Sequence, residues 1–171
     1  MKHHFFLTNI FLIFGILHVL GQDFEVSPVR LIYNTEPGQT QTKTIMIKNH
    51  GNSRSGFNIT LSDFQPTSNG ARKKLPPNTS KFSLANFINI NPTFFELNPG
   101  ESKEIAISIQ VPNDDYSTKW GILTFQTSEE QTTLEADKNL RAGIVVSPRI
   151  QVEVLQSPSS NTNFEVKINK L

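Results

Sequence analysis

The sequence predicts an all-β protein whose antiparallel strands pack as a sandwich. Two observations lead to this prediction: apolar and polar residues alternate along most of the chain, and no stretch shows the spacing of an amphipathic helix. In the clearest case, Ile105, Ile107 and Ile109 alternate with Ala106 and Ser108. Strict alternation buries one face of a sheet and leaves the other in water, which is typical of antiparallel sheets.

Turn residues separate about seven such stretches, and short strands at this spacing are typical of an immunoglobulin-like sandwich. Two turns, at residues 36–39 and 98–101, each place a Pro-Gly pair before a long alternating strand. Pro fixes φ at the second turn position and Gly supplies a positive φ at the third, so both should be type II turns. The expected strands are residues 24–33, 40–49, 56–64, 87–90, 102–111, 120–127 and 141–155.

The first 21 residues have the composition of a signal peptide. A short basic start at residues 2–4 precedes an apolar run at 5–20, and Gly21 stands where a signal peptidase reads small residues. A retained anchor is the alternative, but the apolar run is short for a spanning helix of about 20 residues and no basic flank follows it. We expect cleavage after Gly21, no membrane span afterwards, and a mature protein in the periplasm or at the cell surface.

The mature chain, residues 22–171, carries no net formal charge, because fifteen Lys and Arg remain after the loss of Lys2, against fifteen Asp and Glu. This balance gives no reason to expect nucleic acid or an acidic lipid surface as a partner. The sequence contains no Cys, so packing and sheet hydrogen bonds must provide the stability that disulfides often give exported domains. The absence of Cys favours a bacterial envelope over an animal secretory pathway.

One immunoglobulin-like domain, residues 22–155, is expected to make up most of the mature chain. Residues 156–163 have the Ser, Asn and Pro content of a linker. Residues 164–171 alternate again, as the first strand of a second domain would. Within the main domain, residues 65–80 form a long loop, and we interpret its basic run Arg72-Lys73-Lys74 as a solvated tip.

The mature sequence offers little for catalysis. It contains one His, His50, and no Cys, so it provides neither a catalytic triad nor the cluster of ligands that a zinc site needs. Asp114 and Asp115 lie in a turn-like stretch without the spacing of a calcium-binding loop. We therefore expect no catalytic residue, no metal site and no cofactor, and a protein that binds a partner.

Two arginines are of interest because they interrupt strongly apolar strands. Arg30 lies between Val29 and Leu31, and Arg149 precedes Ile150. An arginine in such a strand must extend its charge to water, form an ion pair or face a partner. An ordinary outward side chain is the alternative for each residue alone. Their joint occurrence in the first and last strands favours a shared role.

These strands resemble the N-terminal domain of the PapD-like periplasmic chaperones, which assemble pili by the chaperone–usher route. Residues 29–33 (VRLIY) resemble the first-strand motif T-R-[VI]-I-[YF] of that family, and residues 45–49 (IMIKN) resemble its second-strand motif. Residues 97–101 (LNPGE) are similar to its L-x-P-G-[EQ] turn. Residues 147–152 (SPRIQV) lie where the family has a basic residue opening the last strand.

The resemblance implies that Arg30 and Arg149 anchor the terminal carboxylate of an exported subunit. It also implies that the last strand lends alternate apolar side chains to the subunit's sheet. The chain departs from the family pattern at Val29, which replaces Thr, and at Pro148, which removes one backbone donor from the last strand. We also expect the second domain of the chaperones to be missing. The candidate donor side chains are Ile144, Val146, Val152 and Val154.

The chain is also similar to extracellular immunoglobulin-like domains of bacterial cell-surface complexes, in its Pro-Gly turns and in residues 67–70 and 120–125. Two hypotheses follow. The protein is a chaperone-like domain that captures an exported fimbrial or surface subunit by β-augmentation. Alternatively, it is a structural adhesion module that binds peptidoglycan, another cell-wall component or a surface partner.

Overall fold

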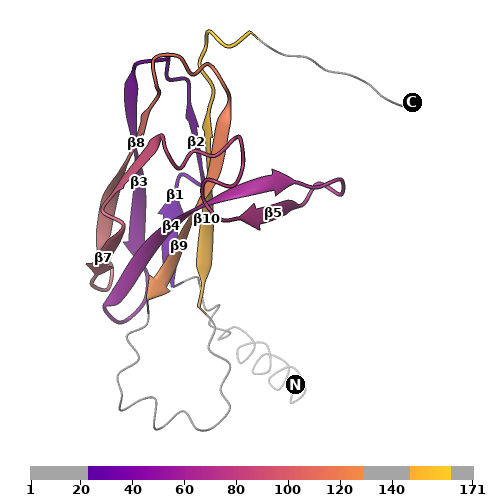
Figure 1. Ribbon diagram of the computed structural model, residues 1–171. Helices are drawn as coiled ribbons and strands as arrows, with labels where there is room; N and C mark the ends of the chain where they lie inside the picture. Colours follow the sequence, from indigo (N-terminus) through magenta and orange to yellow (C-terminus); the bar gives the residue numbers. More distant parts are fainter. Residues whose placement is uncertain (1–22, 129–146, 163–171) are drawn as a thin grey trace, which may run out of the picture.

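A computed structural model describes residues 23–128 and 147–162 of the chain, and these residues form strands and turns without a helix. Two sheets pack face to face as a sandwich (Figure 1), which confirms the predicted fold class. Ten strands are present in these residues, more than the seven expected. No helix in the same residues is long and apolar enough to cross a membrane.

The two sheets contain four and six strands. Neighbouring strands are antiparallel except β2 and β10, which run parallel. The four-stranded sheet has the order β1 (Phe24–Ser27), β3 (Thr40–Asn49), β8 (Ser102–Gln110) and β6 (Ile88–Asn91). The six-stranded sheet has the order β2 (Arg30–Tyr33), β10 (Arg149–Gln156), β9 (Lys119–Ser128), β4 (Ser55–Pro66) and β5 (Arg72–Leu75), and β7 (Phe94–Leu97) also pairs with β4.

The predicted first strand, residues 24–33, is divided between the two sheets. β1 pairs with β3, whereas β2 pairs with β10. The chain crosses from one sheet to the other at Ser27 and Pro28, which are joined by a cis peptide bond. This crossing places Arg30 at the edge of the six-stranded sheet.

Two strands form where the sequence predicted none. After β4 the chain turns at Gly70, whose φ is +79°, and β5 pairs back onto the end of β4. The resulting arm projects from the sandwich (Figure 1). Its strand β5 is charged and mostly exposed, so its composition resembles that of a loop. β7 is only four residues long and follows Pro92, which explains why alternation alone did not reveal it.

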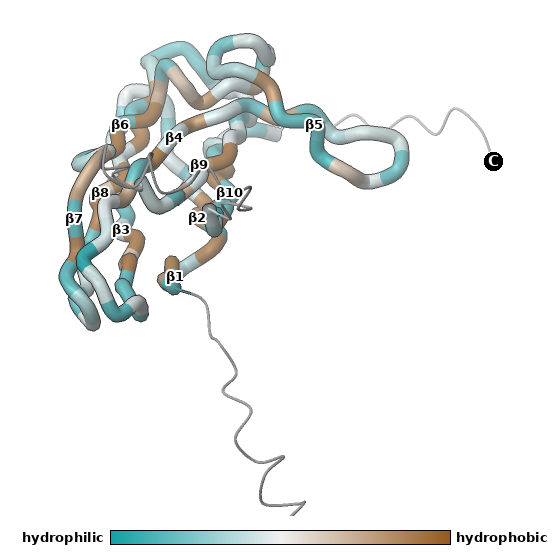
Figure 2. The backbone as a smooth tube through the Cα atoms, turned by 90° about the horizontal axis from the view of Figure 1, so that it is seen from below, coloured by the Kyte–Doolittle hydropathy of each residue, from teal (hydrophilic) through white to brown (hydrophobic). Residues whose placement is uncertain are grey.

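The core lies between the two sheets and follows the predicted alternation. Ile105, Ile107 and Ile109 have no exposed surface, whereas Ala106 between them is exposed. Figure 2 shows the matching alternation of hydrophobic and hydrophilic residues along β3 and β8. The buried hydroxyl of Tyr33 donates a hydrogen bond of 2.7 Å to the carbonyl of Ile107, which joins the two sheets across the core.

Both Pro-Gly turns have the predicted geometry. Gly38 and Gly100 adopt φ values of +77° and +75°, which an L side chain rarely tolerates. The amide of Gln39 donates to the carbonyl of Glu36 at 3.0 Å, and the amide of Glu101 donates to that of Asn98 at 3.0 Å. These turns therefore set the positions at which β3 and β8 begin.

Residues after β10, which composition assigned to a linker, contact the sandwich as far as Asn161, whose side-chain amide donates to the hydroxyl of Thr118 at 3.3 Å. Gln156 is the last residue of β10, and its buried amide pairs with the backbone of Thr35 in both directions, at 3.2 and 2.6 Å. The amide of Ser157 donates to the carbonyl of Tyr33 at 3.1 Å. The amide of Ser160 donates to the carboxylate of Glu36 at 3.1 Å. The predicted signal peptide and the possible second-domain strand lie outside the described residues.

Candidate functional site

The edge of the six-stranded sheet at β10 is only partly covered by strands of the described chain. β10 pairs with β9 along the whole length of β10, from Arg149 to Gln156. β2 covers the opposite edge of β10 only from Glu153 to Gln156. Among residues 23–128 and 147–162, no strand pairs with residues 149–152 on that side. Within the described residues, the first half of β10 is therefore an open edge.

The hydrogen-bond pattern identifies which backbone groups face the open edge. The amide of Glu153 donates to the carbonyl of Val29 at 3.1 Å, so the backbone of Glu153 faces the β2 side. Backbone groups of successive residues in a strand point to opposite sides, so those of Arg149 and Gln151 face the same way as Glu153. Pro148 falls on the opposite side, toward β9. The N–H that proline lacks would have faced β9, so Pro148 does not reduce the number of donors at the open edge.

Two apolar side chains that are exposed or only partly buried lie beside the open edge. Val29 immediately precedes β2 and is 59% exposed, although its neighbour Leu31 is buried. Ile150 points inward from β10 and packs against the core, yet it is only partly buried. Exposure along the inner face of β10 thus increases toward the end that lacks a partner strand. A strand added at this edge would cover both side chains.

Glu153 occupies the position opposite Arg30 in the parallel pair of β2 and β10. Its carboxylate accepts a hydrogen bond of 2.9 Å from Nε of Arg30 and forms an ion pair with Nη2 of the same residue at 2.7 Å. Nη2 of Arg72, carried on the projecting arm by β5, pairs with the other oxygen of the same carboxylate. Two guanidinium groups therefore grip one carboxylate, and that carboxylate belongs to the protein itself.

Arg149 lies on the same outward face as Arg30 but opposite Gln126, four residues before Glu153. Four residues of strand span about 13 Å, so the structure does not bring the two predicted anchors together. Arg149 is exposed and forms no ion pair with any residue in the described ranges. The second guanidinium beside Arg30 is that of Arg72, which sequence analysis interpreted as part of a solvated tip.

The four predicted donor side chains divide into two groups. Val152 and Val154 have no exposed surface and belong to the core between the sheets. In this structure the open edge presents the backbone of β10 and the partly exposed Ile150, whereas these two valines contact their own sandwich. Ile144 and Val146 lie outside the described residues.

A cavity of about 480 Å³ lies on the outward face of the six-stranded sheet beside the projecting arm. Phe64, Trp120 and Leu155 provide its apolar wall, and the Arg30–Glu153–Arg72 cluster provides its charged wall. The indole N–H of Trp120 donates to the carbonyl of Phe64 at 3.2 Å, which ties β9 to β4. Arg72 lies over the ring of Phe64, 5.4 Å from its centre, and its ion pair with Glu153 joins the arm to β10.

His50 and Asp115 both have hydrogen-bond partners within the described chain. His50 pairs with Glu25 at 3.0 Å on the exposed side of the four-stranded sheet. No group of three or more His, Cys, Asp or Glu in these residues is arranged to hold a metal ion. Asp115 is bound to Ser117 and Lys119 within its own loop.

No protein-family model and no curated protein matches the chain, but solved structures do. The PapD-like domain 7 of human CEP192 is 10% identical with a TM-score of 0.52, over 84% of this chain and 92% of that domain. The chaperone–tip adhesin complex of CFA/I fimbriae gives 13% identity and a TM-score of 0.57, over 81% of this chain and 57% of that one. The CsuC–CsuE chaperone–tip adhesion subunit complex of Acinetobacter baumannii gives 11% and 0.53, over 81% and 58%.

The fold is PapD-like. The likeness therefore confirms the resemblance drawn from the strand motifs, at the level of the fold. This chain spans just over half the length of the fimbrial chaperone chains that it matches. Those structures are described as chaperones in complex with a tip adhesin or tip adhesion subunit.

Proposed function

We propose that this protein is a non-catalytic binding domain of the bacterial cell envelope that captures a partner protein by β-augmentation along residues 149–152 of β10. The observation that carries the proposal is the open edge at the first half of that strand. Exposed strand edges readily accept an extended segment from another chain, because its backbone completes the unpaired ladder. The partner would be an exported fimbrial or surface subunit, and the site of action the periplasm or the cell surface.

The residues around the edge supply the other parts of such a site. The backbone groups of Arg149 and Gln151 would form the main-chain hydrogen bonds. Val29 and Ile150 would pack against apolar side chains of the added strand. Arg149, whose guanidinium has no acidic partner in the described residues, would pair with a carboxylate of the captured segment. Arg30 is paired with Glu153 and would influence capture only by positioning that carboxylate.

The solved structures of the same fold include complexes of the proposed kind. The CFA/I and CsuC–CsuE structures are described as complexes of a chaperone with a tip adhesin or tip adhesion subunit. Identities of 13% and 11% establish a shared fold, so the exported subunit as partner of this chain rests on the open edge and the strand motifs.

Site-specific photo-crosslinking in the source cells tests the proposal. A photoreactive residue at position 151 should crosslink to an exported protein, because that position lies on the open edge. The same residue at position 106, on the exposed face of the four-stranded sheet, serves as the control. Crosslinks at 106 and none at 151 would contradict β-augmentation and favour the adhesion hypothesis, in which a sheet face contacts the partner.

Two substitutions of one residue then separate backbone from side-chain recognition. Gln151→Pro removes the N–H that faces the open edge, whereas Gln151→Ala keeps it and removes only the side chain. Since the described ladder does not use this N–H, both variants should fold. We expect the proline variant to bind the crosslinked protein at least about tenfold more weakly and the alanine variant to bind normally. Equal binding by both variants would exclude main-chain recognition at this position.

A further inference from the structure

A second cavity, of about 610 Å³, lies on the four-stranded sheet, away from the β10 edge. It is formed where the ends of β3, β6 and β8 meet the loops at Gly38 and Asn113. We propose that this cavity binds an uncharged oligosaccharide. The proposal does not depend on β-augmentation, because β10 contributes no residue to this cavity.

The polar groups of the cavity are amides and hydroxyls. Asn86, Asn89, Gln110 and Asn113 line it, together with the hydroxyl of Thr40. The side-chain amides of these four residues make no hydrogen bond to any other side chain or backbone group in residues 23–128 and 147–162. Each amide offers two N–H donors and one carbonyl acceptor. Four such groups are therefore available to a ligand in one place.

The cavity contains no charge. None of its lining residues is acidic or basic, although charged residues make up 18% of the chain. Beside the cavity, the uncharged Thr42 lies next to the lining residues Ser108 and Asn89 in the register of β3, β8 and β6. The hydroxyls of Thr42 and Ser108 share a hydrogen bond of 2.7 Å. The cavity thus opens onto a neutral, hydrogen-bonding strip of the sheet.

This chemistry defines the ligand class. Charged side chains give the strongest contacts to a phosphate or carboxylate, and carboxylates are common ligands of metal ions, but the lining of this cavity has neither. A carbohydrate presents many neutral hydroxyl groups, each a donor and an acceptor, which suit the amides and hydroxyls of the lining. Phe87 and Ile88, both partly exposed, line the cavity as well. They offer apolar surface to the C–H groups of a sugar ring.

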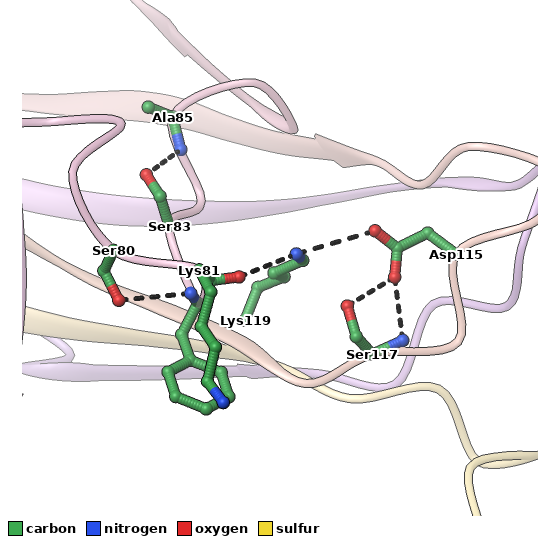
Figure 3. A network of polar contacts seen from close by, with 8 residues as sticks. Ser80, Lys81, Ser83, Ala85, Asp115, Ser117 and Lys119 are labelled. Atoms are coloured by element: carbon green, nitrogen blue, oxygen red, sulfur yellow. Dashed lines mark hydrogen bonds and ion pairs between the residues drawn. The ribbon is translucent and has the colours of Figure 1, made fainter.

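The loop that carries Asn86 and Phe87 is fixed by a polar network (Figure 3). The ammonium of Lys119 donates to the carbonyl of Lys81 at 3.0 Å, pairs with Asp115 at 3.6 Å and lies 5.2 Å from the centre of the Phe87 ring. The backbone N–H of Gln110 donates to the carbonyl of Phe87 at 2.8 Å, which attaches the loop to the end of β8. A fixed loop reduces the entropy that a ligand must remove on binding.

The opposite wall depends on Gly38. A Cβ at this position would lie 2.6 Å from Oδ1 of Asn113, and the φ of Gly38 is +77°. The amide of Gly38 donates to the carbonyl of Val111 at 3.0 Å, so the Pro-Gly turn is attached to the chain that follows β8. Glycine therefore allows the turn and the Asn113 amide to come together at one side of the cavity.

Titration of the full chain with cellohexaose, chitohexaose, mannohexaose and laminarihexaose, followed by calorimetry and by NMR of the side-chain amides, tests this inference. We expect at least one of these neutral sugars to bind and to shift the amide signals of Asn89 and Gln110. Gln110→Ala should weaken that binding at least tenfold. Gln65→Ala, which removes an exposed side-chain amide from β4 in the other sheet, is the matched control and should have no effect.

Three results would overturn the proposal. One is the absence of binding by all four sugars at about 10 mM. Another is binding that Gln110→Ala leaves unchanged, because the sugar would then occupy a different surface. The third is binding at this cavity of polygalacturonate or of an unstructured peptide in place of the neutral sugars.

Discussion

At the scale of single residues, the carboxylate of Glu153 determines what the predicted anchor Arg30 can do. Arg30 and Arg72 both bind this carboxylate, so an incoming carboxylate would have to displace it. Arg149 has no such partner in the described residues and lies at the open half of β10. The two arginines singled out by the sequence therefore differ in their availability to a ligand.

This difference predicts unequal effects of two substitutions. Arg149→Ala should weaken capture of the partner by about 2–5 kcal/mol if its guanidinium pairs with a desolvated carboxylate. Arg30→Ala should have a much smaller effect on capture, because its charge is already paired with Glu153. Affinity measurements with the crosslinked partner check both values. A larger loss of affinity for Arg30→Ala than for Arg149→Ala would show that Arg30 on β2, and not Arg149, binds the carboxylate of the partner.

Tyr33 provides a test of the core through pH. Burial raises the pKa of Tyr33 to about 12, despite a smaller opposing effect of a hydrogen bond involving Lys43. The folded state therefore holds this proton more tightly than the unfolded state, whose tyrosine has a pKa of about 10. The stabilisation is fully present below pH 10 and is lost as the pH rises toward 12.

We expect the free energy of unfolding of the wild-type chain to fall between about pH 10 and pH 12. Tyr33→Phe should remove the part of this fall that Tyr33 causes, at the cost of the hydrogen bond to Ile107. Denaturant titrations of both proteins across this range provide the measurement. An identical pH dependence in the two proteins would show that Tyr33 ionises as readily in the folded state as in the unfolded state.

At the scale of elements, β8 is the strand whose environment the sequence predicts most clearly. Ile107 has no exposed surface, so Ile107→Ala should lower the free energy of unfolding by about 2–5 kcal/mol. Ala106→Ser changes the exposed face of the same strand and should have little effect. Chemical denaturation measures both. Similar losses for the two variants would mean that the strand is not buried on one face only.

The segment after β10 gives a second test at this scale. Truncation after Gln156 removes the hydrogen bonds that Ser157 and Ser160 form with Tyr33 and Glu36. We expect a loss of stability of about 1–3 kcal/mol, measured by thermal and chemical unfolding. Truncation after Thr162 keeps these contacts and is the control. If both truncated chains are as stable as the whole chain, residues 157–162 act as the linker that their composition suggests.

At the scale of the whole molecule, the sequence was sufficient for the sandwich but not for the contacts between distant strands. Alternation along β3 and β8 revealed the core because each strand has one buried face. The β5 arm was missed because it has little buried face to produce alternation. The Arg30–Glu153 pair joins residues 123 positions apart through a parallel register, which local patterns cannot reveal.

The sequence also did not predict the open edge, for a related reason. The strand motifs predicted that the last strand meets a partner, but they did not indicate which half of β10 the chain itself covers. That division follows from where β2 begins, and β2 begins where the first strand crosses between the sheets. The predicted donors Val152 and Val154 became core residues because they point inward between both sheets.

Amide hydrogen exchange along β10, resolved by NMR for the free protein and for its complex with the crosslinked partner, tests the central proposal most directly. In the free protein we expect Ile150 and Val152, whose amides face β9, to exchange slowly, and Arg149 and Gln151 to exchange rapidly. Binding should slow exchange at Arg149 and Gln151. Rapid exchange at both residues in the complex, with new protection elsewhere on the protein, would contradict capture by β-augmentation.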